Sequence, residues 1–200
     1  MKKKFVDFCM NIIQSNNSNL SKKEIDKLRY GLEGLHLTIT KIIFIIIISL
    51  LLGILKETII LLLIFNIIRF VAFGVHAKKS IDCLVSSTLF FIIFPILCIN
   101  IVIPITIKYI ISPILVLLIG IFAPSDTVKR PIINKKKRII YKILSILISS
   151  IYVTLSIFIK NNTLSNCFIF ALVIQIIVIL PITYKIFGVP YNNYKNYETN

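Results

Sequence analysis

The sequence predicts an all-α polytopic membrane protein with about six transmembrane helices, an N-terminal interfacial amphipathic helix and a cytoplasmic re-entrant segment. Three observations support this fold class. Hydrophobic residues make up 57% of the chain, charged residues only 16%, and the mean hydropathy is +0.92. Apolar runs recur at close to the ~20 residues that cross a bilayer. The basic residues collect in alternate loops, which is typical of membrane topology. The composition and hydropathy exclude an ordinary water-soluble domain.

The amphipathic helix is predicted at the start of the chain, over residues 5–13, directly after the three lysines at positions 2–4. Helical periodicity gathers the apolar side chains of this stretch on one face, which is typical of a helix in the membrane interface. Those side chains are Phe5, Phe8, Cys9, Ile12 and Ile13. In the polar stretch that follows, Ser21 precedes Glu24 by three positions and predicts a capping box at a helix start.

Six apolar runs follow, at 32–55, 57–73, 84–107, 109–123, 139–159 and 164–186. If these runs span the membrane, nineteen Lys and Arg residues lie on one face of it, and three lie in the loops on the opposite face. By the positive-inside rule, both termini are cytoplasmic. We therefore expect a cytoplasmic and interfacial segment at 1–31, a six-helix membrane domain at 32–187 and a cytoplasmic tail at 188–200.

The net charge of +15 does not indicate a nucleic-acid partner, because the basic residues lack the aromatic interleaving of a single-strand binding groove. The four cysteines, at 9, 83, 98 and 167, have no CxxC spacing. We therefore expect neither a disulfide framework nor a metal site, and no cofactor. Cys98 and Cys167 are interpreted as small apolar side chains. The amides of Asn66, Asn100 and Gln175 should each face another helix.

His76 and Cys83 stand together where the apolar pattern is interrupted. A thiol nucleophile needs a base to take its proton, so this pair is a candidate for cysteine catalysis. Seven positions on a straight helix would separate the two side chains by about 10.5 Å along the axis. Reacting groups must approach to about 3 Å. We therefore expect the helix to break between them, with Gly74 and the polar segment 77–82 permitting a re-entrant turn.

A third residue could orient the histidine, as in other triads. Asp82, Ser80 and Asp126 are the candidates, and the sequence does not rank them. Arg69, Lys78 and Lys79 supply positive potential beside the pair, which favours a thiolate and attracts an anionic peptide. Lys129 and Arg130 are further candidates for contacts with such a peptide, although the positive-inside pattern accounts for most of these charges.

Several stretches resemble the AgrB family of bacterial quorum-sensing peptidases. Residues 69–83 (RFVAFGVHAKKSIDC) carry the family's arginine, its glycine shortly before a histidine, and its cysteine seven positions on. The chain departs from the common pattern at Phe73, where the family usually has a second glycine. Residues 30–35 (YGLEGL), residues 123–132 (APSDTVKRPI), the stretch from Gln175 to Pro181, and Gly188 resemble further family signatures in the same order.

This resemblance implies a thiol endopeptidase in the bacterial cytoplasmic membrane. Its substrate would be an AgrD-like precursor peptide with an acidic C-terminal tail. Membrane lipid would surround the protein. Cys83 would be the nucleophile and His76 its base, with Arg69 and Gly74 in supporting positions. Cleavage would leave a thioester on Cys83, from which a side chain of the peptide closes a thiolactone or lactone ring. The family also implies a homodimer.

Two alternatives belong to other classes of protein. A six-helix substrate-binding subunit of a small-molecule importer would have similar length, but it would have no use for a cytoplasmic His and Cys pair. A catalytically inactive scaffold is the second alternative, favoured by the missing glycine at position 73. Mutation of Cys83 distinguishes the first from a peptidase, and the alkylation rate of Cys83 distinguishes the second.

Overall fold

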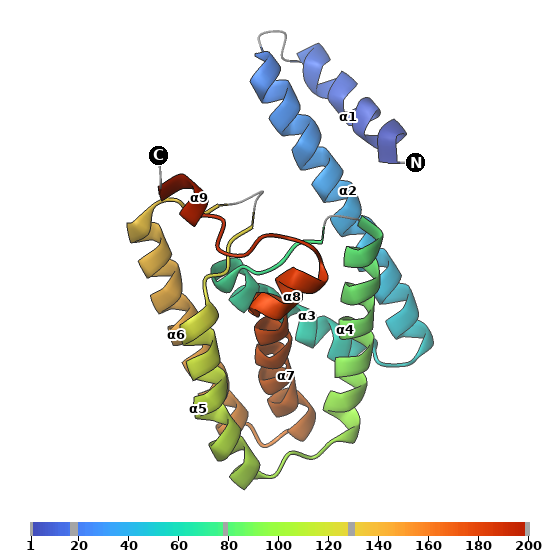
Figure 1. Ribbon diagram of the computed structural model, residues 1–200. Helices are drawn as coiled ribbons and strands as arrows, with labels where there is room; N and C mark the ends of the chain where they lie inside the picture. The colour runs from blue at the N-terminus through green and yellow to red at the C-terminus, as the bar shows by residue number, and fades with distance from the viewer. Residues whose placement is uncertain (1, 17–19, 78–79, 128–130, 199–200) are drawn as a thin grey trace. The chain divides into compact units, whose positions relative to one another are not determined.

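The computed structural model describes residues 2–16, 20–77, 80–127 and 131–198, and the elements in these ranges are helices. The chain divides into two compact units, Met1–Ile47 and Ile48–Asn200. Figure 1 shows the order of the helices along the chain. Because α2 runs through the boundary, its first part belongs to the first unit and its last turn to the second.

The first unit contains α1 (Lys2–Asn16) and most of α2 (Lys22–Leu51). The predicted capping box begins α2, since both Ser21 N and Ser21 Oγ donate to Glu24 Oε2, at 2.8 and 2.7 Å. In α1, Val6 and Met10 are buried, whereas Phe8 and Ile12 are exposed. The helix therefore buries part of its apolar surface within the unit and leaves another part exposed.

The second unit is a bundle of α3 (Leu55–Ala72), α4 (Ser80–Asn100), α5 (Ile105–Phe122), α6 (Lys135–Phe158) and α7 (Asn162–Ile179). Most of α7 is buried, and it contacts all four of the others. Figure 1 shows α7 standing between α4 and the pair formed by α5 and α6. Two short helices, α8 (Pro181–Ile186) and α9 (Lys195–Glu198), follow it.

Five helices within the described ranges are long and apolar enough to cross a membrane, so the chain is a polytopic membrane protein. They are Glu24–Leu51, Ile81–Asn100, Ile105–Phe122, Lys135–Phe158 and Asn162–Ile179. The remaining predicted span, 57–73, corresponds to α3, whose 18 residues include Lys56, Glu57 and Arg69. Because α3 is only 18 residues long, its whole length includes all three charges, whereas each of the other five helices contains an apolar stretch of 18 residues with at most two charges.

The last predicted run, 164–186, is not one helix. Helix α7 ends at Ile179, and Leu180 is extended, with φ −63° and ψ 139°. Pro181 then begins α8. A proline ring disfavours the helical conformation at the residue before it, and proline suits the first position of a new helix.

The prediction that Asn66 and Asn100 face other helices is wrong. The amide nitrogen of Asn66 donates to Leu62 O at 2.7 Å, and that of Asn100 donates to Ile96 O at 2.8 Å. Each amide meets a carbonyl one turn back on its own helix, because a helical carbonyl can accept a second hydrogen bond. Of the three amides named in that prediction, the one of Gln175 reaches a different segment, donating to the carbonyl of Phe73 at 2.8 Å.

Candidate functional site

Three segments that are distant in sequence meet at one end of the second unit, which we call the site end. They are residues 72–75, which follow α3, residues 123–127, which follow α5, and the stretch from the last turn of α7 through residue 194. Figure 1 shows the corresponding connections together with α8 and α9. The site end therefore gathers three of the four sequence stretches that resemble family signatures.

The backbone of residues 73–75 is fully paired. Gly74 N donates to Ser125 O at 2.8 Å, Ser125 N donates to Ala72 O at 3.0 Å, and Val75 N donates to Val178 O at 2.8 Å. Phe73 N closes α3 by donating to Arg69 O at 3.0 Å. These N–H groups are consequently not available to bind an oxyanion.

A single guanidinium holds all three carbonyls of the same segment. Arg69 Nη1 donates to Phe73 O at 2.6 Å, and Nη2 donates to Gly74 O at 3.1 Å and to Val75 O at 2.8 Å. The planar fork of arginine suits such multiple acceptors, which a lysine could not reach together. Arg69 also lies within electrostatic reach of Cys83. Both the N–H groups and the carbonyl groups of residues 73–75, the segment leading to His76, are thus fixed by hydrogen bonds.

Gly74 has φ +128°, which side chains rarely adopt. A Cβ at this position would lie 2.8 Å from Val178 O and would also collide with the Arg69 guanidinium. Phe73 has φ +57°. Glycine adopts this conformation without strain, which gives a physical reason for a second glycine here in the family pattern. In this chain, the Phe73 ring packs edge-on against Tyr141, with centroids 5.0 Å apart.

Asp126 is buried, and its carboxylate accepts three backbone hydrogen bonds. Asn193 N donates to Oδ1 at 2.9 Å, while Tyr194 N and Ile132 N donate to Oδ2 at 2.9 and 3.3 Å. Burial raises the pKa of Asp126, and the three N–H donors and Arg138 oppose that change. The carboxylate thus joins the loop after α5 to the segment after α8.

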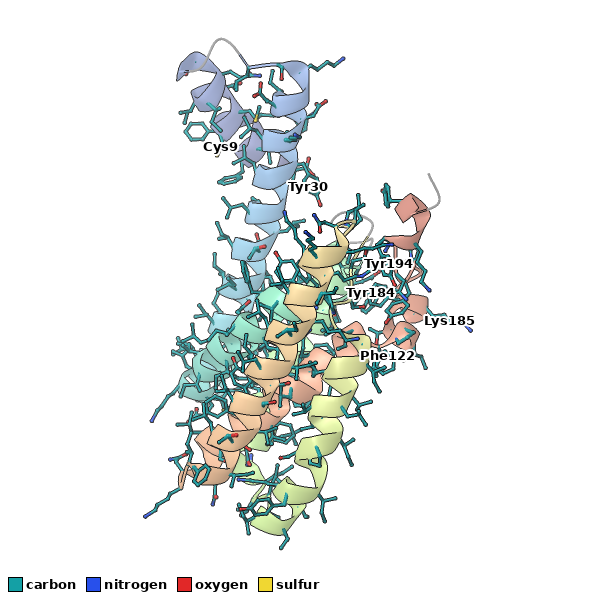
Figure 2. All side chains as sticks on the ribbon, turned by 90° about the vertical axis from the view of Figure 1, so that its left-hand side faces the viewer. Cys9, Tyr30, Phe122, Tyr184, Lys185 and Tyr194 are labelled. Carbon is teal, nitrogen blue, oxygen red and sulfur yellow. The ribbon has the colours of Figure 1, made fainter. Side chains whose placement is uncertain are left out.

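Tyr184 is the second buried link at the site end. Its hydroxyl donates to Ser125 O and Asp126 O, both at 3.0 Å, and burial raises its pKa to about 12. Figure 2 shows Tyr184 turned toward the helices and its neighbour Lys185 projecting away. No local sequence pattern marks Tyr184, so it was not among the predicted residues. The run APSDT did mark the loop that Tyr184 contacts.

His76 and Cys83 do not lie on one continuous helix. His76 is exposed, in the non-helical stretch one residue after Val75, and Cys83 is half-buried in the first turn of α4. The N–H groups of a first turn have no carbonyl partner within their own helix. Asp82 lies in the same turn, and its carbonyl accepts a hydrogen bond from Ser86 Oγ at 2.7 Å.

Ser80 is the first residue of α4. The candidate peptide contacts Lys78, Lys79, Lys129 and Arg130 lie outside the described residues. Cys98 and Cys167 are buried, in agreement with their interpretation as apolar side chains. Within the part of the chain that the structure describes, no group of three His, Cys, Asp or Glu residues could hold a metal ion.

The helices and the site define a multi-pass membrane protein with an arginine-clamped turn between two helices, followed by a histidine and a cysteine. The chain belongs to the AgrB family, because the family model Accessory gene regulator B matches residues 6–179.

Several AgrB-like proteins are similar over most of their length. That of Clostridium acetobutylicum is 34% identical, covering 88% of this chain and 84% of its own. The AgrB-like protein of Clostridium beijerinckii is also 34% identical, covering 92% and 89%. One from Listeria monocytogenes is 29% identical, covering 86% and 84%. No solved structure matches the chain.

Proposed function

We propose that this protein is a membrane-embedded cysteine endopeptidase that removes the acidic C-terminal tail of an AgrD-like quorum-sensing precursor. Membership of the AgrB family supports the substrate class. The observation that carries the proposal is the clamped, non-helical segment 73–75, which leads directly to His76 and is followed by a helix with Cys83 in its first turn. A fixed turn of this kind can bring a base and a nucleophile together.

In the proposed reaction, His76 takes the proton of the Cys83 thiol, and the sulfur attacks the scissile carbonyl carbon. The proton passes to the leaving amine as the C–N bond breaks, which releases the acidic tail and leaves a thioester on Cys83. A thiol or hydroxyl within the peptide then attacks the thioester, closes the ring and returns the thiol. The N–H groups of the first turn of α4 are the candidates to stabilise the oxyanion, because those of residues 73–75 are already paired.

The proposed topology places the site end at the cytoplasmic face of a bacterial cell membrane. Helix α3 then adds a sixth span to the five, residues 73–77 belong to the re-entrant catalytic segment, and both termini are cytoplasmic. Lys135, Lys136 and Lys137 begin α6 with exposed side chains at the same end. Together with Lys78, Lys79, Lys129 and Arg130, they would attract the acidic tail of a precursor whose own amphipathic leader holds it on the membrane.

The test uses the full chain in membrane vesicles with a tagged precursor that ends in an acidic tail. Cys83→Ser, Cys83→Ala and His76→Ala should each abolish tail release, whereas Cys9→Ser should retain it. In the parent, a hydroxylamine-sensitive covalent adduct with the peptide should form on Cys83. Undiminished cleavage by both Cys83 variants would disprove the proposal.

Alkylation distinguishes the peptidase from an inactive scaffold. We expect Cys83 to react with iodoacetamide near neutral pH faster than Cys9, which is similarly half-buried but lies in the first unit. His76→Ala should slow the reaction of Cys83 and leave that of Cys9 unchanged. Equal rates for the two thiols in the parent would favour the scaffold.

A further inference from the structure

Residues 191–194, which we call the clasp, are attached to the site end by backbone as well as side-chain contacts. Asn193 is buried, and the N–H groups of Asn193 and Tyr194 donate to the two carboxylate oxygens of Asp126, each at 2.9 Å. The guanidinium of Arg138 lies 3.5 Å from the centre of the Tyr194 ring. Figure 2 shows Tyr194 and Tyr184 in the same region of the second unit.

The residue next to Asp126 continues the connection toward His76. Ser125 pairs with the turn after α3 through both its backbone groups, and its hydroxyl donates to Ile179 O at 3.3 Å. Ser125 O accepts from Gly74 N and from the Tyr184 hydroxyl. Displacing the 125–126 peptide would therefore disturb the hydrogen bonds of Gly74, two residues before His76.

Asp126 was one of three candidates for the residue that orients the histidine. Its carboxylate oxygens already accept the N–H groups of Ile132, Asn193 and Tyr194. A carboxylate with three donors in place is suited to hold backbone, and the backbone that it holds belongs to the loop and the clasp. This arrangement indicates an effect on the site through Ser125.

We infer that the clasp is a positioning element of the site, which Asp126 fastens to the 125–126 peptide so that the turn at residues 73–75 keeps His76 in place. The inference rests on the proposed function, because it assigns the clasp a part in that reaction. Asp126 and residues 191–194 touch neither the substrate nor the reacting atoms in this scheme. Their contribution is to the order of the turn.

The first test compares Asp126→Asn with the parent in lipid nanodiscs. The asparagine keeps the oxygen that faces Asn193 N and turns an NH₂ group toward the N–H groups of Tyr194 and Ile132, so the clasp should loosen. Hydrogen exchange measured by mass spectrometry should then accelerate about tenfold in peptides covering residues 190–194 and in those covering 73–75. Asp26→Asn, at an exposed position on α2, is the matched control and should change neither.

The second test separates positioning from a loss of folding. Tyr194→Ala keeps the backbone donor to Asp126 but removes the ring from Arg138, and Tyr194→Phe restores that ring. We expect kcat for precursor cleavage to fall about tenfold in Asp126→Asn and about threefold in Tyr194→Ala, with KM unchanged within twofold. Tyr194→Phe should recover the parental kcat.

The outcomes distinguish this inference from the proposed function. Fast exchange at residues 190–194 with parental exchange at 73–75 would overturn the inference, and so would a parental kcat in a variant whose clasp has loosened. Either result leaves Cys83-dependent cleavage by the parent intact. If the parent does not cleave the precursor, the proposed function fails, and the exchange at residues 73–75 alone decides whether the clasp orders the turn.

Discussion

The two ends of the second unit both contain buried polar groups. Those at one end bind the backbone of a non-helical turn, and those at the other end join the ends of helices. At the site end, Arg69, Gln175 and Ser125 bind backbone groups of a turn that contains two residues with positive φ. At the far end, Asn166 donates to the carbonyls of Cys98 and Ile101, where α4 ends, and Lys108 donates to Ser165 Oγ at 2.5 Å.

The two sets of contacts therefore have different roles: one fixes the conformation of the turn before His76, and the other joins neighbouring helices. Far-end contacts satisfy carbonyls that every helix leaves unpaired, so their loss should lower stability. Site-end contacts keep a strained, non-helical backbone in one conformation, so their loss should lower activity more than stability. The following predictions test this difference, starting with the largest expected effect.

Gly74→Ala should reduce precursor cleavage by about 100-fold, because the added Cβ meets Val178 O and the Arg69 guanidinium and must displace the turn. Gly53→Ala is a matched control. Gly53 also has positive φ, at +70°, but a Cβ there meets nothing within 4 Å. Initial rates in vesicles at equal protein content provide the measurement. Equal losses in both variants would show that backbone strain alone is responsible.

Arg69→Lys should reduce kcat by about tenfold or more, since one ammonium cannot donate to the carbonyls of Phe73, Gly74 and Val75 together. The positive charge near Cys83 is retained in this variant, so the effect reports hydrogen bonding. Faster hydrogen exchange at residues 73–75 should accompany the loss. Parental kinetics would contradict the assigned clamp.

Asn166→Leu should lower the melting temperature by about 2–4 °C, because two carbonyls at the end of α4 lose their donor, at roughly 1 kcal/mol. Cleavage per folded molecule should stay within twofold of the parent. Thermal unfolding in detergent, followed by circular dichroism, gives the first quantity. A large loss of activity without a change in melting temperature would contradict the proposed difference between the ends.

Tyr184→Phe should give the smallest effect, which should be visible mainly in how the melting temperature changes at alkaline pH. Burial raises the pKa of Tyr184 from 10.0 to about 12, because the phenolate is disfavoured there and cannot donate to the carbonyls of Ser125 and Asp126. Its stabilising contribution is complete below about pH 10 and is lost as the pH rises through about 12.

Melting temperatures measured between pH 8 and 11.5 should therefore fall less steeply for Tyr184→Phe than for the parent. Tyr109→Phe, at an exposed position on α5, serves as the control and should keep the parental slope. If all three proteins show the same slope, the pKa of Tyr184 is not raised by folding and its ionisation does not affect stability.

Local patterns determined the parts of this protein that depend on neighbouring residues. Apolar runs gave the long helices, Ser21 and Glu24 gave the start of α2, and the combination of Gly74 with polar residues indicated an interruption before Cys83. Such features depend on periodicity, capping and proline or glycine geometry within a few residues. The sequence similarly identified His76 and Cys83 as the candidate pair.

Tertiary structure alone decided which distant groups complete the turn. Phe73 and Gln175 are 102 positions apart, and Asp126 and Tyr194 are 68 apart, so no local periodicity reports their contact. The same limit led to the wrong prediction for Asn66 and Asn100, because an amide can meet its own helix or another one at similar energetic cost. Short-range preferences specify helices, whereas the pairing of their ends is settled only when the whole bundle packs.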